Sequence, residues 1–236
     1  MDERHAAIRN LPSLTPATPA DLAAALREAS AAGRPVVPLG AGAHQHLGAP
    51  PPAGALHIGT VALNQVLEYA PADLTATAQA GVTLAALQQE LARHGQWLPW
   101  DPPGGERATL GGLLAAALSG PLRLGYGAPR DWVLGMRVAL GDGRIVKSGG
   151  RVVKNVAGYD AHKLHIGALG TLGVILDVTF KLAPLPERMA TLAWACPDLQ
   201  AALTLARALR ERPLAPVSLA LLARPAAPTT SDQRPA

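Results

Sequence analysis

Several residue types that mark common functional classes are scarce in this 236-residue chain. Cys196 is the sole cysteine. A single cysteine cannot form a disulfide within the chain. It also cannot hold an iron–sulfur cluster, because such a cluster takes about four thiolates. Three tyrosines and one phenylalanine are too few for a base-stacking platform. The net charge is +4, but the basic residues are scattered, so the sequence does not indicate nucleic-acid binding.

Long apolar runs are also absent. No window of about 18 residues is free of charge and proline, so we expect no membrane span. Residues 1–10 carry Asp2, Glu3, Arg4 and Arg9 without an apolar core, so we expect no signal peptide and a cytoplasmic location. Hydrophobic residues make up 49% and charged residues 16%, which is typical of a globular protein.

The first hundred residues alternate between helix and strand signals. Thr18 before a proline predicts a helix start, and Gly33 marks its end. Thr83 begins a second expected helix, which ends before Gly95. Short apolar runs predict strands between these helices, at residues 35–39, 56–58 and 74–79. This alternation indicates an α/β unit.

Residues 101–185 are rich in glycine, with short segments between the glycines. Strands are expected at residues 133–140, 144–147 and 173–182, with helices only at 109–119 and 161–169. Residues 190–223 show a β-α-β pattern: a strand at 191–195, a helix at 199–210 and a strand at 217–222. The segment 224–236 is polar and rich in Pro, Ala, Thr and Ser, so we expect it to be disordered.

A first glycine motif, Gly40-Ala41-Gly42-Ala43-His44, directly follows an expected strand. Glycine lets backbone N–H groups approach a phosphate closely. The motif is neither a Rossmann fingerprint nor a P-loop, because Gln45 replaces the third glycine and no Gly-Lys-Ser/Thr follows. A tight turn without a ligand remains an equal alternative on these residues alone.

A second motif runs from Pro102-Pro103-Gly104-Gly105 to Ala108-Thr109-Leu110-Gly111-Gly112. A threonine and paired glycines at a helix start can present unpaired N–H groups to an anion. The alternative is a helix with small residues for close packing.

A third motif joins the segment 154–160 to the segment 170–175, which ends in an apolar strand. The backbone of that strand could contact the edge of a flat heterocycle. Val174 and Ile175 would then pack on its face.

The order of these motifs, from about residue 20 to residue 186, resembles the FAD-binding domain of the vanillyl-alcohol oxidase type, also called PCMH type. Segments 119–123, 130–135 and 154–160 are most similar to the FAD-binding subunits of glycolate oxidases. The resemblance implies an α+β fold, with a small α/β subdomain and a larger mixed or antiparallel sheet with flanking helices. It implies this domain at residues 18–186, after a lead-in at 1–17 and before a partial cap domain at 187–223.

The resemblance also implies the roles of individual residues toward FAD. Gly40, Ala41, Gly42, Ala43 and His44 would wrap the pyrophosphate. Thr109, Gly111 and Gly112, preceded by Pro103 and Gly105, would line the ribityl region, and Ser119, Gly120, Tyr126 and Gly127 would border the isoalloxazine. Val174 and Ile175 would complete the cleft, while Lys154, Asn155 and Asp160 would fix loops.

Some relatives attach FAD covalently through a histidine at the position of Ala43, so non-covalent binding is expected here. Ala41 and Ala43 replace a usual glycine and a usual Ser or Thr, which puts hydrogen bonds to phosphate in doubt. His44 and His46 are too few to hold a metal.

The implied partners are a catalytic flavoprotein subunit and an iron–sulfur subunit of a glycolate oxidase-like complex. Through these subunits the chain could be associated with a membrane. The chain would be an FAD-binding subunit that supports oxidation of glycolate to glyoxylate. A scaffold with a degenerate flavin site and a stand-alone alcohol or hydroxy-acid oxidoreductase are the alternatives. The short cap predicts an exposed apolar surface for subunit docking. The residues identify no catalytic group.

Overall fold

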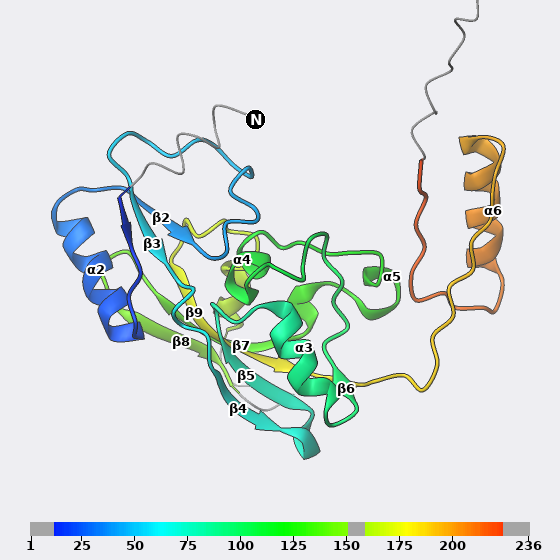
Figure 1. The fold of residues 1–236 in the computed structure, drawn as a ribbon, viewed down its shortest axis with the longest axis horizontal. Coiled ribbons are helices and arrows are strands. Elements are labelled where there is room, and N and C mark those ends of the chain that lie inside the picture. Colours follow the sequence, from blue (N-terminus) through cyan, green and yellow to red (C-terminus); the bar gives the residue numbers. More distant parts are fainter. Residues whose placement is uncertain (1–11, 151–158, 224–236) are drawn as a thin grey trace, which may run out of the picture.

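The computed structural model describes residues 12–150 and 159–223. The N-terminal part contains a small parallel sheet in the order β1-β3-β2, covered by one helix (Figure 1). Its elements are β1 (Ser13–Leu14), α2 (Pro19–Ala31), β2 (Val36–Leu39) and β3 (Leu56–Gly59). Pro38 is accommodated because β2 is an edge strand, where a missing N–H costs no ladder bond.

The larger sheet has five strands in the order β4-β5-β9-β7-β8, and all neighbouring strands are antiparallel. Its strands are β4 (Val66–Ala70), β5 (Thr75–Gln79), β7 (Val133–Ala139), β8 (Ile145–Gly149) and β9 (Val174–Lys181). The remaining elements of this part are η1 (Pro71–Asp73), α3 (Leu84–Ala92), β6 (Gln96–Trp97), α4 (Leu110–Ala115), α5 (Arg123–Tyr126), η2 (Pro129–Asp131), η3 (Ala161–Leu164) and β10 (Ala183–Pro184). The expected α+β fold of PCMH type is confirmed.

Local capping explains where the helices begin. The hydroxyl of Thr18 accepts a hydrogen bond from the N–H of Asp21 at 3.1 Å, and that of Thr83 accepts one from Ala86 at 3.2 Å. Gly33, with φ +60°, follows the end of α2, in a backbone conformation that favours glycine. The two helices predicted in the first hundred residues are confirmed.

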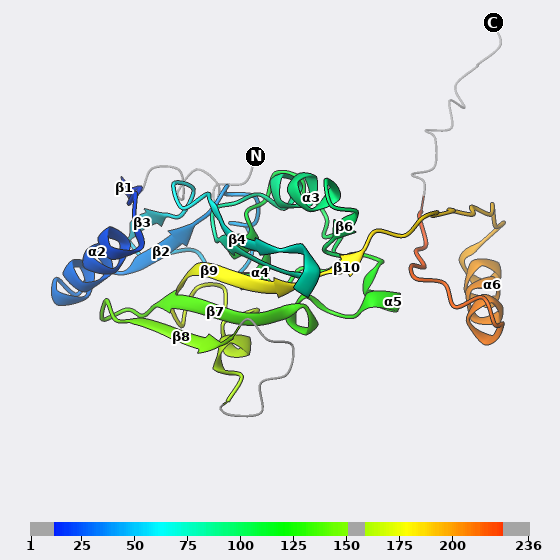
Figure 2. The same cartoon turned by 90° about the horizontal axis from the view of Figure 1, so that it is seen from below.

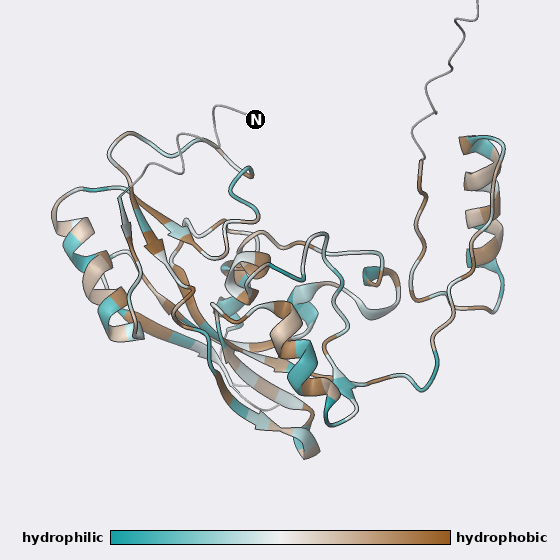
Figure 3. Cartoon of the chain, in the orientation of Figure 1, coloured by the Kyte–Doolittle hydropathy of each residue, from teal (hydrophilic) through white to brown (hydrophobic). Residues whose placement is uncertain are grey.

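Two hydrophobic clusters hold the layers together. The larger one packs α3 and α4 on the five-stranded sheet, with Leu87, Leu113 and Phe180 fully buried. The smaller one joins α2 to β3 and β9 through Leu22 and Leu176. Strand β9 is shared by both clusters, so it fixes the small sheet relative to the large one (Figure 2). In Figure 3 the hydrophobic residues follow these strands.

One strand was not predicted, and two local expectations were wrong. Strand β4 (Val66–Ala70) was not predicted, and it forms by pairing with β5. The helix expected at 109–119 ends at Ala115, and Ala117 has a positive φ of 50°. The helix expected at 161–169 is reduced to the single 3-10 turn η3.

The segment 187–223 contains one helix, α6 (Leu199–Glu211), with no buried residue. The strands expected at 191–195 and 217–222 do not form, because no neighbouring strand pairs with them in the described residues. Several large apolar side chains of this segment are exposed: Leu199 is 67% exposed, Trp194 52% and Leu222 92%. Across residues 12–150 and 159–223, no helix has the length and hydropathy needed to cross a membrane.

Candidate functional site

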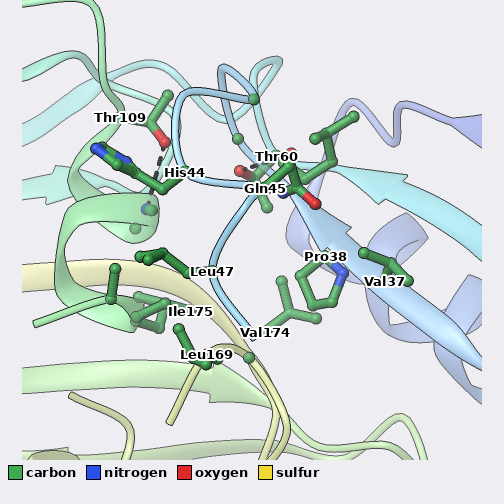
Figure 4. Close-up of a pocket in the computed structure, with 18 of the residues that line it drawn as sticks. Val37, Pro38, His44, Gln45, Leu47, Thr60, Thr109, Leu169, Val174 and Ile175 are labelled. Atoms are coloured by element: carbon green, nitrogen blue, oxygen red, sulfur yellow. Dashed lines mark hydrogen bonds between the residues drawn. The ribbon is translucent and has the colours of Figure 1, made fainter. Parts of the chain in front are cut away.

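A cavity of about 340 Å³ lies where the two sheets meet. Its walls come from β2 and the following loop, from the start of α4, and from the segment that leads into β9 (Figure 4). Ten of the predicted site residues line it: Gly40, Ala41, Gly42, Ala43, His44, Thr109, Gly111, Gly112, Val174 and Ile175. Three motifs that are far apart in the sequence therefore share one cavity.

The loop after β2 needs glycine at two positions. A Cβ on Gly40 would lie 2.2 Å from Oγ1 of Thr109, so no side chain fits there. Gly42 has φ +75°, a conformation that glycine adopts without strain. The first glycine motif thus brings the backbone against the hydroxyl of Thr109 and keeps that side of the cavity free of side chains.

The N–H groups of this loop are available to a ligand. Among the described residues, no acceptor takes a hydrogen bond from the backbone N–H of residues 41–44. Ala41 and Ala43 do not have positive φ, so alanine fits at both positions without strain. Successive unpaired backbone N–H groups form a concave binding site for an anion such as phosphate.

The start of α4 contributes differently from what its sequence predicts. Its first N–H groups are not unpaired: that of Leu110 donates to Val82 at 2.8 Å and that of Gly111 to Ala80 at 2.9 Å. The third, from Gly112, donates to the Thr109 hydroxyl at 3.3 Å. The expectation of unpaired N–H groups at this helix start is therefore wrong.

What α4 offers the cavity is one hydroxyl and two residues without side chains. Oγ1 of Thr109 uses a lone pair to accept from Gly112, which leaves its proton free for a ligand. Gly111 packs closely on Ala80, where a Cβ would lie 2.8 Å from that methyl group.

The opposite side of the cavity is apolar. Figure 4 shows Leu47, Leu169, Val174 and Ile175 there, across from Thr109 and His44. The sequence interpretation missed Leu47 and Leu169. The glycines beside them, Gly48 and Gly170, are the signal that could have pointed to them. The cavity thus combines hydrogen-bond donors with a flat apolar surface.

Burial favours the neutral form of one histidine of the wall. His165 lines the cavity, and burial lowers the pKa of its imidazole. Its Nδ1 is buried without a hydrogen-bond partner among the described residues. His165 was not among the predicted site residues.

The other six predicted site residues do not line this cavity: Pro103, Gly105, Ser119, Gly120, Tyr126 and Gly127. Pro103 and Gly105 lie in the loop before α4, and the other four lie in the segment 119–127, which includes α5. Asp101 joins these loops, because its carboxylate accepts from the N–H of Leu122 at 3.1 Å. Gly120 is required at this contact, since a Cβ would lie 1.9 Å from the Asp101 carbonyl oxygen.

An aromatic group surrounds the end of α5. The ring of Tyr126 meets that of Trp97 edge-on, with centroids 5.4 Å apart. Trp132 donates from its indole N–H to the carbonyl of Tyr126 at 2.9 Å. Tyr126 therefore anchors α5 to the body of the domain.

The third motif lies partly outside the described residues, which exclude Lys154 and Asn155. Asp160 is described, and its carboxylate accepts from Nζ of Lys163 at 2.6 Å. This hydrogen bond lowers the pKa of Asp160. The contact fits the expected role of Asp160 in fixing a loop.

Comparison with known proteins gives a match to the FAD binding domain family over residues 13–149. The glycolate oxidase subunit GlcE of Escherichia coli is 42% identical over 54% of this chain and 37% of its own length. The glycolate oxidase subunit GlcD of Bacillus subtilis is 35% identical over 81% of this chain and 41% of its own length. The chain therefore spans less than half the length of these relatives.

A solved structure of an alkyldihydroxyacetonephosphate synthase superposes on 75% of this chain with a TM-score of 0.64 and 26% identity. The superposition covers 32% of that protein. The similarity in fold thus extends over most of the chain.

Proposed function

Because the chain belongs to the FAD binding domain family, we propose that it is an FAD-binding subunit of a glycolate oxidase-like complex. In this role it supports the flavin-dependent oxidation of a 2-hydroxy acid, glycolate to glyoxylate, as part of an oxidoreductase. The observation that carries the proposal is the glycine loop: residues 41–44 line a cavity with an apolar opposite wall, and their N–H groups have no acceptor among the described residues.

FAD is the cofactor of this family, and the residues present fit it. A dinucleotide carries a doubly charged pyrophosphate between two flat ring systems. The unpaired N–H groups and the Thr109 hydroxyl suit the pyrophosphate. The apolar wall of Val174 and Ile175 suits a ring or the sugar beside it. A side chain at Gly40 would collide with the Thr109 hydroxyl and displace it from this wall.

The domain boundaries and residue roles follow from this fit as parts of the proposal. Residues 18–186 form the FAD-binding domain, and 187–223 a partial cap. The loop 40–44 binds the pyrophosphate, and the loops at 101–105 and 119–127 extend the site toward the isoalloxazine. Binding is non-covalent, since Ala43 has no nucleophile for a flavin bond.

When bound, the flavin supplies the acceptor for the hydride of a hydroxy acid. This chain's residues hold the cofactor and keep water from one face of it. A hydroxy-acid site also needs a cation for the carboxylate. No Lys or Arg belongs to the cavity lining in the described residues. We therefore assign the binding of the substrate carboxylate to a partner, the catalytic flavoprotein subunit. An iron–sulfur subunit is the third member of the proposed complex.

The exposed apolar surface of residues 187–223 supports the assignment of partners. Leu192, Trp194 and Leu199 are each more than half exposed. Exposed apolar side chains that gather on one segment are common at contacts with other proteins.

A non-catalytic scaffold with a degenerate flavin site is the second candidate, since Ala41 replaces a usual glycine and Ala43 replaces a usual Ser or Thr, whose hydroxyl could donate to a phosphate. The backbone weighs against it, because both alanines have ordinary φ values and leave their N–H groups unpaired among the described residues. A stand-alone oxidoreductase is the third candidate, and the lack of a cation in the described lining weighs against it.

The visible absorption spectrum of the purified protein tests the proposal, before and after FAD is added and the excess removed. We expect flavin bands that stay with the folded protein and are released on denaturation. A protein that retains no flavin would contradict the cofactor role and favour the scaffold.

A pair of glycine variants locates the site. Gly40→Ala places a methyl group at the Thr109 hydroxyl, so we expect it to abolish flavin retention. Gly141→Ala is the control, because a Cβ there meets nothing within 4 Å. Equal flavin retention in both variants would show that the loop after β2 does not bind the cofactor.

A further inference from the structure

His162 is a buried histidine that joins the edge strand β8 to the turn η3. It is 2% exposed. The hydroxyl of Ser148 accepts from the backbone N–H of His162 at 3.0 Å and lies 3.3 Å from Nδ1 of its ring. The other ring nitrogen, Nε2, is buried and has no hydrogen-bond partner in the described part of the chain. The site therefore accommodates a neutral ring, whose Nε2 is buried next to the backbone of Val133 without a close hydrogen bond in the described residues.

The turn that carries His162 leads directly into the wall of the FAD cavity. After η3, the N–H of Gly167 donates to the carbonyl of Leu114 and that of Leu169 to the carbonyl of Ala115, both at 2.9 Å. These bonds attach the segment to the end of α4. Leu169 holds a positive φ of 52°, which is strained for a leucine. Such a conformation persists only while the surrounding contacts hold it in place.

Burial outweighs the groups around the ring that favour its protonation. Burial is the main cause that lowers the pKa of His162. Asp160 and the backbone of Val133 oppose this shift, while Lys163 and His165 add to it. The strands packed against the ring present only the backbone of Val133 from β7 and the Ser148 hydroxyl from β8. Asp160 is itself paired with Lys163, which reduces its effect on the ring.

We propose that His162 is a positioning residue that makes FAD binding sensitive to pH, by holding the cavity wall at residues 165–171 in place only while its ring is neutral. This inference rests on the proposed FAD site. Protonation would place a charge on a ring that is almost fully removed from water, which costs free energy. The ring then leaves its site, the hold on η3 is lost, and Leu169 no longer keeps its position in the wall.

The direction of the effect follows from linkage. The pKa of His162 is lowered while its ring is buried and the cavity wall is in place. This arrangement is therefore most stable above the ordinary pKa of histidine and becomes less stable as the pH falls. With an ordinary pKa of about 6.5, FAD affinity should fall by up to roughly tenfold between about pH 7.5 and about pH 5.5.

The test is an FAD titration of the full chain, followed by quenching of flavin fluorescence across this pH range. His162→Asn keeps a polar group near Ser148 but cannot titrate, so we expect it to bind FAD with a much flatter pH dependence. His94→Asn is the control, because His94 is exposed and its ring contact is to Tyr69, outside the cavity. The control should keep the wild-type profile.

An unchanged pH profile in His162→Asn would overturn the inference. If the variant does not fold, NMR titration of the wild-type imidazole decides instead. A His162 pKa at or above the ordinary value in the FAD complex would also overturn it. Failure of the wild-type protein to bind FAD at about pH 7.5 would contradict the proposed function itself, a result distinct from pH-independent binding.

Discussion

Thr109 has two roles in this structure, and a single substitution separates them. Its hydroxyl caps α4 by accepting from the N–H of Gly112 at 3.3 Å. The same hydroxyl is on the cavity wall beside Gly40, with its proton free for a phosphate oxygen. Thr109→Val keeps the shape of the side chain and removes the hydroxyl. The substitution should therefore affect both the stability of the protein and its affinity for FAD.

The two effects have different expected sizes. Loss of an N-cap hydroxyl costs about 1 kcal/mol of protein stability. A hydrogen bond from a neutral hydroxyl to a charged phosphate contributes about 1.5–3 kcal/mol, so FAD affinity should fall roughly tenfold to a hundredfold. Thr109 is only 2% exposed, so water does not easily replace the lost hydroxyl.

The structure supplies a matched control for this substitution. Thr83 caps α3 in the same way, by accepting from Ala86 at 3.2 Å, and it does not line the cavity. Urea unfolding of the FAD-free proteins should show similar losses for Thr83→Val and Thr109→Val. Flavin fluorescence titration should show weaker binding only for Thr109→Val.

The reasoning about Thr109 makes two separable claims. Equal FAD affinity in the two valine variants would refute the claim that the Thr109 hydroxyl contacts the cofactor. Wild-type stability in both would instead refute the importance of the helix caps. A Thr109→Ser variant should restore both properties, because it keeps the hydroxyl.

Three further predictions concern stability. Gly120→Ala should destabilise the fold by about 2 kcal/mol or more in thermal unfolding, because the added Cβ would lie 1.9 Å from the carbonyl oxygen of Asp101. An unchanged melting temperature would contradict the close packing of Gly120 on Asp101. Asp177→Asn should lower the free energy of unfolding in urea by about 1–2 kcal/mol, because it removes the carboxylate that accepts from Arg137 at 2.7 Å. Partial exposure of the arginine limits the loss. A double-mutant cycle that shows no coupling between the two residues would contradict a stabilising ion pair. Burial lowers the pKa of His57. The free energy of unfolding should therefore be unaffected by this histidine above its ordinary pKa of about 6.5 and should fall at lower pH. His57→Asn should reduce this pH dependence, and an equal slope in both proteins would exclude His57 as its source.

The sequence predicted the features that depend on neighbouring residues. Thr18 and Thr83 mark helix starts because a cap needs only an N–H three residues later. The order of the glycine motifs predicted the PCMH-type fold, and ten of the predicted site residues do line one cavity. Gly40 and Gly42 could be chosen because few other residues allow a backbone to approach a ligand so closely.

Other features depend on contacts between distant segments, which the sequence does not display. Strand β4 exists because β5 pairs with it, whereas the apolar runs at 191–195 and 217–222 have no such neighbour in the described residues and stay without strand structure. Both outcomes follow from the need of a strand for hydrogen bonds to another strand.

The sequence by itself determined the helix caps and the glycine loop, since each is specified within a short stretch of chain, and it determined the family of the fold through the order of its motifs. Only the tertiary structure decided which N–H groups remain free for a ligand. It directed the N–H groups of Leu110 and Gly111 to Val82 and Ala80, and left those of residues 41–44 unpaired among the described residues. It also buried His162 beside Ser148. The physical reason is that hydrogen-bond pairing and burial depend on which distant segments pack together, and this is settled only when the two sheets meet.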